Sequence, residues 1–112
     1  MTKESLQPDA DPVNILKRLL ARLEKLGLLA DINKFCIDGN VLLEDVFSAR
    51  RHAHVVRVRH RIWLWLHEER RWSYPSIASL FDRDHTSVMH GAKMAARDLG
   101  LPVPSGRTRR AA

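Results

Sequence analysis

A short polar run, Arg83-Asp84-His85-Thr86-Ser87, carries side chains that can hydrogen-bond to the edges of DNA bases. Asp84 can accept a hydrogen bond from cytosine N4 or orient a neighbouring donor, and His85 and Thr86 can hydrogen-bond to base edges. The methyl group of Thr86 can also touch a thymine methyl group. These residue types predict a surface that reads sequence in the major groove.

The flanking residues predict two short helices joined by a tight turn. Ser73 is a candidate N-cap of the first helix, with Pro75 in its first turn. Polar residues 82–84 interrupt the apolar pattern, and the last of them, Asp84, can cap the second helix. Each helix has one apolar stripe, formed by Ile77, Leu80 and Phe81 in the first and by Val88, Ala92, Ala95 and Leu99 in the second. Two helices joined by so short a turn cross steeply, as in a helix-turn-helix, whose second helix reads bases from its N-terminal end.

Positive charge is concentrated in the half of the chain that contains this run. The chain has 112 residues and a net charge of +6. Residues 1–48 contain six Lys and Arg against eight Asp and Glu, whereas residues 49–112 contain thirteen against five. Such a basic half is the electrostatic footprint of a polyanion binder, although it could also serve only solubility. We favour nucleic acid because the same half holds the base-reading run.

Several side chains are placed to hold DNA phosphates, which fix register rather than sequence. They are Arg59, His60, His67, Arg71, Arg83, Ser87 and Lys93. A basic segment, residues 50–54, is a candidate arm along DNA, since an arginine can enter the negative potential of the narrow minor groove. The alternative for this segment is a solvated basic loop.

Other functional classes find little support in the sequence. Cys36 is the single cysteine, so no disulfide framework exists and a reducing cytoplasm is expected. The polar start predicts no signal peptide, and no apolar run is long enough for a membrane span. His85 and His90 are five residues apart, which rotates them off a shared helical face, so we expect neither a metal site nor catalysis. No cofactor is expected, because the chain lacks a G-x-x-x-x-G-K-[ST] phosphate-binding loop.

The predicted organisation is a disordered lead-in over residues 1–11, one domain over 12–101 and a basic flexible tail over 102–112. The first helix is expected to begin at Asp11-Pro12, with Gly27 ending or kinking it. Its apolar stripe consists of Val13, Leu16, Leu20 and Leu23. This stripe could pack onto the domain or form a dimer seam, so a monomer and a weak dimer both remain open. A short helix over 43–49 and a long central helix over 55–70 follow. The fold class is therefore all-α, a small orthogonal bundle of five or six helices.

The motif resembles a known family. Residues 83–90, Arg-Asp-His-Thr-Ser-Val-Met-His, are similar to a motif in the C-terminal DNA-binding domain (domain IV) of the bacterial replication initiator DnaA. The resemblance extends back through residues 73–77, 48–51 and 41–47, and so covers roughly residues 40–99. It implies a fold similar to DnaA domain IV and the Trp repressor, and a DnaA box, a short asymmetric duplex site, as the target.

The resemblance also implies roles for individual residues. Asp84, His85 and Thr86 would be the major-groove readers and Arg51 the minor-groove arginine, while Tyr74 and Pro75 would contact bases through apolar surface. The sequence departs from the family pattern at five positions. Asp82 and Ala78 replace usual glycines, Ser87 replaces Thr, Gly91 replaces Ala and His60 replaces a common Gln. None removes a main base reader, but Gly91 should cost up to ~1 kcal/mol of helix stability.

The functional hypothesis is sequence-specific binding of double-stranded DNA at DnaA-box-like sites, without ATPase activity. The chain would regulate replication initiation or transcription, in competition with the DnaA initiator, on the nucleoid. The alternative is a protein-interaction or dimerisation module that uses the leucine-rich N-terminal helix and binds DNA non-specifically.

Overall fold

The computed structural model describes residues 12–104, and every regular element in that range is an α-helix. Residues 1–11 and 105–112 lie outside the described residues, and with them the predicted lead-in, the Asp11 cap and most of the predicted tail. Within residues 12–104, no helix is both long and apolar enough to cross a bilayer. The chain divides into two compact units, residues 1–34 and 35–112.

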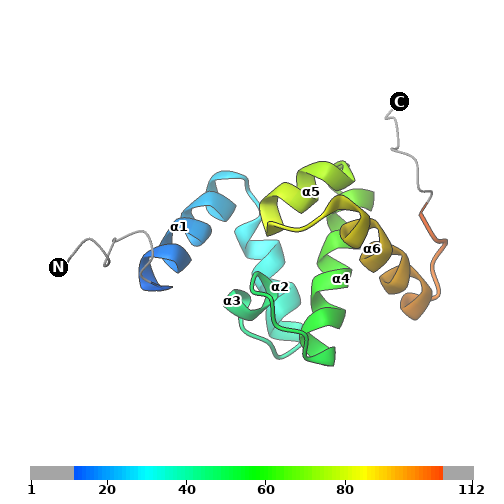
Figure 1. Cartoon of the computed structure of the whole chain (residues 1–112), viewed down its shortest axis with the longest axis horizontal. Helices are drawn as coiled ribbons and strands as arrows, with labels where there is room; N and C mark the ends of the chain where they lie inside the picture. The colour runs from blue at the N-terminus through cyan, green and yellow to red at the C-terminus, as the bar shows by residue number, and fades with distance from the viewer. Residues whose placement is uncertain (1–11, 105–112) are drawn as a thin grey trace. The chain divides into compact units, whose positions relative to one another are not determined.

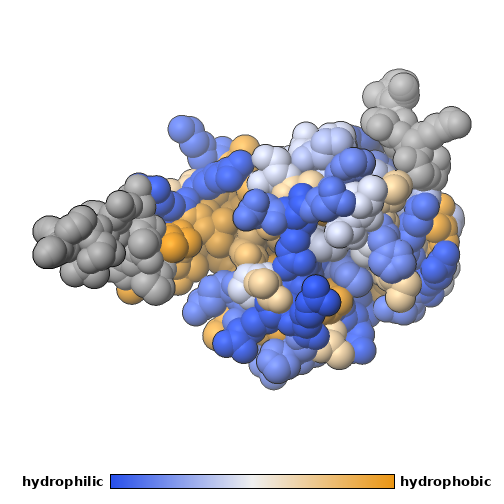
Figure 2. All heavy atoms as spheres, in the orientation of Figure 1, coloured by the Kyte–Doolittle hydropathy of each residue, from blue (hydrophilic) through white to orange (hydrophobic). Residues whose placement is uncertain are grey.

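The first unit contains α1 (Pro12–Lys25) and the beginning of α2 (Leu29–Asp38). The sequence correctly placed the start of α1 at Pro12 and its end before Gly27, which adopts a φ of 74°. Leu23 is fully buried, whereas Val13 and Ile15 are 58% and 52% exposed. Hydrophobic residues are accordingly visible at the surface of α1 (Figure 2). The predicted stripe of α1 is therefore covered only in part.

The second unit is a bundle built on α4 (Ala53–Glu68), which contacts α3 (Leu43–Val46), α5 (Tyr74–Phe81) and α6 (His85–Leu99). The longest contact runs between α4 and α6, and α5 packs on both of them (Figure 1). Helices α5 and α6 are joined by three residues and form the predicted helix-turn-helix. The all-α fold class is thus confirmed.

The boundary of α3 differs from the sequence prediction. This helix ends at Val46, not at Ala49, and Phe47 takes φ −92° and ψ 1°. The Ser48 hydroxyl donates to the carbonyl of Asp45 at 2.7 Å, which satisfies one of the carbonyls exposed at the helix end. Residues 47–52, called here the α3–α4 loop, therefore begin with a turn and continue as an irregular connection in place of the predicted last helical turn.

The core of the second unit is aromatic and includes a glycine that leaves space for it. Trp63 is 2% exposed and meets Phe81 edge-on, with ring centroids 5.7 Å apart. Phe81 stacks on Phe47 at 4.2 Å. A Cβ atom added to Gly91 would lie 2.6 Å from carbon atoms of both Trp63 and His60. The missing side chain of Gly91 thus lets α6 approach α4 closely.

The two stripes of the helix-turn-helix were predicted well, with one error. Ile77, Leu80 and Phe81 are all buried. In α6 the predicted residues Val88, Ala92 and Ala95 are buried, but Leu99 is 45% exposed. Leu99 is the last helical residue before the Gly100 stop, so its side chain extends beyond the packed part of the helix.

A left-handed residue ends four of the helices, and it allows the next N–H to bond a carbonyl five residues back. The residues are Gly27, Asn40, Asp82 and Gly100. At the turn of the helix-turn-helix, Asp82 has φ 55° and the Arg83 N–H donates to the carbonyl of Ala78 at 2.9 Å. Asp82 therefore takes the conformation for which glycine is usual.

Candidate nucleic-acid interface

The N-terminus of α6 presents the predicted base readers to solvent. Asp84 occupies the N-cap position, and Asp84, His85, Thr86 and Ser87 are all exposed. The Asp84 carboxylate makes no capping bond to a backbone N–H; it accepts a hydrogen bond from the Thr86 hydroxyl instead. This contact couples the acceptor and the donor that were predicted to face bases.

The N-terminus of α5 holds Pro75 at the surface and Tyr74 in the interior. The Ser73 hydroxyl accepts the Ser76 N–H at 3.2 Å, which confirms the predicted cap. Tyr74 is 4% exposed and stacks on His67 at 4.0 Å, while Nδ1–H of His67 donates to the carbonyl of Trp72 at 2.9 Å. His67 is itself only 2% exposed, so we remove Tyr74 from the predicted base contacts and His67 from the phosphate contacts.

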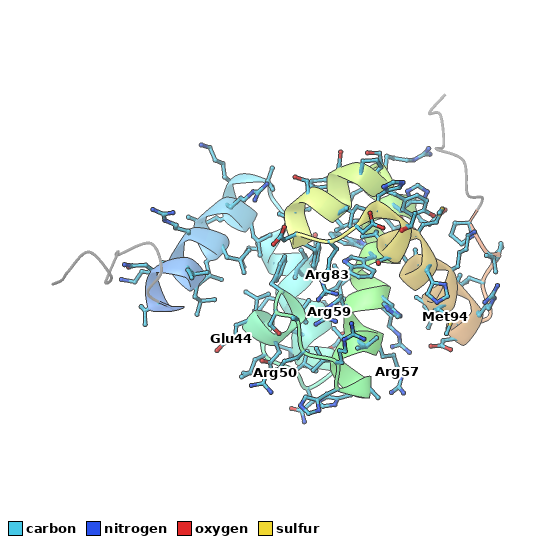
Figure 3. All side chains as sticks on the ribbon, in the orientation of Figure 1. Glu44, Arg50, Arg57, Arg59, Arg83 and Met94 are labelled. Carbon is cyan, nitrogen blue, oxygen red and sulfur yellow. The ribbon has the colours of Figure 1, made fainter. Side chains whose placement is uncertain are left out.

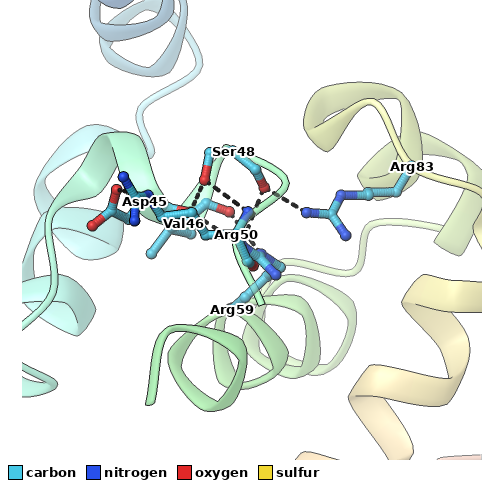
Figure 4. A network of polar contacts seen from close by, with 6 residues as sticks. All are labelled: Asp45, Val46, Ser48, Arg50, Arg59 and Arg83. Carbon is cyan, nitrogen blue, oxygen red and sulfur yellow. Dashed lines mark hydrogen bonds and ion pairs between the residues drawn. The ribbon is translucent and has the colours of Figure 1, made fainter. Parts of the chain in front are cut away.

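Arg59 is a second predicted phosphate contact that the structure places inside. It is 3% exposed, and its guanidinium donates to four backbone carbonyls of residues 45–50 (Figure 4). Nε bonds Val46 at 2.8 Å, and Nη2 bonds Asp45, Ser48 and Arg50 at 3.0, 3.1 and 3.0 Å. Arg59 is thus a support for the end of α3 and the α3–α4 loop, and we remove it from the phosphate set.

Arg83 reaches the same loop from the helix-turn-helix. Its Nη2 donates to the carbonyl of Ser48 at 2.6 Å, so this one oxygen accepts from both Arg83 and Arg59. Figure 3 shows Arg59 and Arg83 lying close to each other, whereas Arg57 of the same α4 points outward. Burial, and then the charge of Arg83, lower the pKa of Arg59 to about 10, which leaves it charged at neutral pH.

A basic pocket of about 360 Å³ lies where the α3–α4 loop, α4 and the start of α6 meet. Five of its lining residues are basic and none is acidic: Arg51, Arg59, His60, Arg83 and His90. Thr86 and Ser87 contribute hydroxyl groups, and Trp63 and Val56 contribute apolar surface. Such a pocket suits an anion that is hydrogen-bonded on one side and open to solvent on the other.

The surroundings of His60 in this pocket disfavour its protonated form. Burial lowers its pKa below the ordinary value of 6.5, and the charges of Arg59 and His90 lower it further, against an opposing effect of Asp98. A phosphate that entered the pocket would reverse this balance and favour the protonated form.

The remaining predicted contacts are spread over the surface of the second unit. Arg51 is exposed in the α3–α4 loop and lines the basic pocket. Lys93 is half-buried on α6, seven residues after Thr86 and therefore on the same helical face. Arg71 is exposed and adopts a φ of 63° between α4 and α5. No three His, Cys, Asp or Glu side chains within residues 12–104 come together as metal ligands would.

The support of the α3–α4 loop by Arg59 was not predicted, although the sequence contains a pattern that indicates it. Arg59 follows Val55 by four residues and precedes Ile62 by three, so helical periodicity places it on the buried stripe of α4. His67 follows Trp63 by four residues and is placed inside by the same rule. A cation on an apolar stripe of this kind predicts a buried support, not a surface contact.

A helix-turn-helix with an exposed polar recognition turn and an adjacent basic pocket defines a class of DNA-binding domain. The comparisons identify the family within this class. The sequence model of the family described as bacterial DnaA protein helix-turn-helix matches residues 32–94. The chain therefore belongs to this family. Membership in it implies DNA binding.

Curated relatives carry the name chromosomal replication initiator protein DnaA. The protein from Herminiimonas arsenicoxydans is 33% identical over 87 residues, which cover 76% of this chain and 19% of the relative. The protein from Ralstonia nicotianae is 34% identical over 83 residues, which cover 72% of this chain and 16% of the relative. The chain thus spans less than a fifth of the length of these relatives. No solved structure matches it.

Proposed function

We propose that this chain binds duplex DNA sequence-specifically at DnaA-box-like sites. The observation that carries the proposal is the basic pocket, which brings Arg51 of the α3–α4 loop next to Thr86 and Ser87 of the recognition helix. An arginine for one groove and a helix N-terminus for the other then lie on either side of a site suited to a backbone phosphate.

The proposed contacts are those predicted residues that the structure leaves accessible. Asp84, His85 and Thr86 read bases in the major groove, Pro75 adds apolar contact, and Arg51 enters the minor groove. Phosphates are held by His60, Arg71, Ser87 and Lys93. Arg83, which was also predicted to hold phosphate, is left out of this set because its guanidinium donates to the Ser48 carbonyl. These residues divide the surface into a reading part and a register-setting part.

The proposed biological role is regulation of replication initiation or transcription on the nucleoid of the bacterial cytoplasm. The relatives are named replication initiators, and a chain that binds the same kind of site competes with an initiator for it. The proposal includes no catalytic step.

Fluorescence anisotropy with a DnaA-box duplex and a scrambled duplex of equal length, at about physiological salt, tests this proposal. We expect a preference for the box of ~10³ or more, as is typical of specific readers. Equal affinity for both duplexes would refute sequence-specific binding to this box.

Two classes of variant separate the reading part from the register-setting part. His85→Ala or Thr86→Ala should lose ~1–3 kcal/mol of discrimination against wrong bases. Lys93→Ala should instead weaken binding to all sequences alike and reduce the salt slope by ~1. The assignment of roles would be wrong if both classes reduced box and scrambled binding equally.

A second candidate function rests on α1. Val13 and Ile15 of this helix are 58% and 52% exposed, and exposed apolar side chains can meet another protein. Light scattering at two protein concentrations tests self-association. A concentration-dependent dimer would favour paired DNA sites at a fixed spacing, and a monomer would favour single asymmetric sites.

A further inference from the structure

The α3–α4 loop is held by far more hydrogen bonds than a solvated basic loop requires. Arg59 donates four bonds to carbonyls of residues 45–50, and Arg83 adds a fifth at Ser48. The Ser48 hydroxyl accepts the N–H of Arg50 at 3.1 Å, and Asp45 pairs with Nε of Arg50 at 3.2 Å. All of these bonds hold residues 45–50, the segment immediately before the exposed Arg51.

The bonds reach the backbone next to Arg51 directly. Nη2 of Arg59 bonds the carbonyl of Arg50, which belongs to the peptide group that joins Arg50 to Arg51. That peptide therefore has a fixed orientation relative to α4, while the side chain of Arg51 stays exposed at the basic pocket. Fixing the backbone before DNA binds reduces the conformational entropy that ordering the loop would otherwise cost.

Arg83 links this loop to the recognition helix. It lies in the turn, one residue before the N-cap Asp84, and its guanidinium lies 6.0 Å from the ring centroid of Trp63. Since its bond goes to the Ser48 carbonyl, a displacement of the turn would move the loop with it. The two segments expected to contact different grooves are thus joined by one side chain (Figure 4).

We infer that Arg83, together with Arg59, is a positioning residue that sets Arg51 at a defined place relative to the recognition helix. This inference rests on the proposed function, because it assigns Arg51 to the minor groove of the same DNA site. Arg83 thereby couples minor-groove reading by the loop to major-groove reading by α6. Arg83 contributes both a positive charge and N–H groups in a fixed direction. A lysine would supply the charge but not that fixed direction.

The test uses a base pair whose change is visible in one groove only. Replacing adenine by 2,6-diaminopurine, opposite thymine, keeps the major-groove pattern of A·T and adds in the minor groove the amino group that a G·C pair carries there. Each A·T pair of the box is substituted in turn. We expect wild-type protein to lose affinity roughly tenfold at one or two adjacent positions, the size of one lost base contact.

Arg83→Lys keeps the charge and shortens the reach to Ser48, and Ser48→Ala removes the bond to Arg50 without altering charge. Both should make binding insensitive to diaminopurine while retaining sensitivity to a wrong base in the major groove. Arg57→Lys, at an exposed residue of α4, is the matched control and should behave as wild type. Full diaminopurine sensitivity in both loop variants, or none in wild type, would overturn the positioning role.

A measurement without DNA separates this inference from the proposed function. In free protein, amide hydrogen exchange of Arg50 should be several-fold faster in Arg83→Lys than in wild type or Arg57→Lys, with the thermal midpoint reported for each. Unchanged exchange would overturn the positioning role even if the box is bound specifically. Failure of wild type to prefer the box refutes the proposed function and leaves the exchange result standing by itself.

Discussion

The exposed recognition turn and the buried loop support are both built from polar and charged side chains, but they use them differently. At the N-terminus of α6, His85 and Thr86 face solvent, and the hydroxyl of Thr86 bonds only to Asp84. Behind them, Arg59 is 3% exposed and all its described hydrogen bonds go to backbone carbonyls. A positive charge in this chain is therefore no evidence of a DNA contact until its burial and its partners are known.

The comparison also explains why both regions are needed. Base contacts require side chains that are free to meet a ligand, and such side chains gain specificity only when the backbone that holds them is rigid. Arg59 also supplies the donors that the carbonyls of Val46 and Arg50 accept from, so the support serves folding and positioning at once.

The largest effect is expected when the support is broken. Arg59→Lys keeps the charge but cannot donate to four carbonyls at once, and we expect a loss of about 3 kcal/mol in the free energy of unfolding. Urea denaturation measures it, with Arg57→Lys as the control on the same helix. A loss below about 0.5 kcal/mol, typical of a surface substitution, would show that the bonds of Arg59 contribute little.

An intermediate effect is expected on the buried side of the recognition helix. Gly91→Ala should gain up to ~1 kcal/mol from helix propensity, yet the added Cβ would lie 2.6 Å from Trp63 and His60. Overpacking of this kind costs about 1–3 kcal/mol, so we expect net destabilisation. A Trp63→Leu background relieves the contact with Trp63 but keeps the one with His60, so Gly91→Ala should be less destabilising there than in the wild-type background. A stabilising Gly91→Ala in the wild-type background would contradict the close packing of α4 and α6.

The smallest effect concerns the contribution of His60 to the pH dependence of stability. His60 lines the basic pocket together with Arg59 and Thr86. Its pKa in the folded state is lowered by burial and by Arg59, His90 and Arg83, against Asp98. The unfolded chain therefore binds the proton more readily, and stability falls as the pH is lowered through about 6.5, the ordinary histidine value. His60→Gln should flatten the stability curve between pH 7.5 and 5.5, measured by urea denaturation at about four pH values. An unchanged slope would exclude His60 as its source.

The same residue makes a prediction for DNA binding with the opposite sign. Phosphate in the pocket favours protonated His60, so binding should take up a proton and become tighter as the pH falls. The pH dependence of affinity for the box, compared between wild type and His60→Gln, measures this. Equal dependence in the two proteins would place the phosphate away from His60.

Features that depend on neighbouring residues in the sequence could be predicted, and features that depend on a contact with a distant residue could not. The cap at Ser73, the start at Pro12 and the stop at Gly100 each depend on residues within one helical turn, and all three were predicted. The α3 boundary was missed because it depends on the bonds that Arg59 and Ser48 make to residues 45–50.

The candidate site follows the same division. The exposed readers Asp84, His85 and Thr86 could be picked from residue type and position in the recognition helix. From the sequence, Gly91 only lowers the stability of the recognition helix, since glycine has low helix propensity. The structure adds that Trp63 lies against it and that a larger side chain would clash. The charge of Arg59 predicts a phosphate contact, whereas its place on the apolar stripe of α4 predicts the buried support that the structure shows.

The most direct test of the central claim is to map the DNA-contacting surface by amide chemical shifts of the labelled protein, titrated with the box duplex and with a scrambled duplex. We expect box-specific changes at Arg51 and at residues 84–87, with smaller changes near Pro75 and Lys93. The scrambled duplex should shift the phosphate-contacting residues alone. Changes centred on α1, or on a second pocket that is lined by Trp65 and Leu101 among others, would contradict the account.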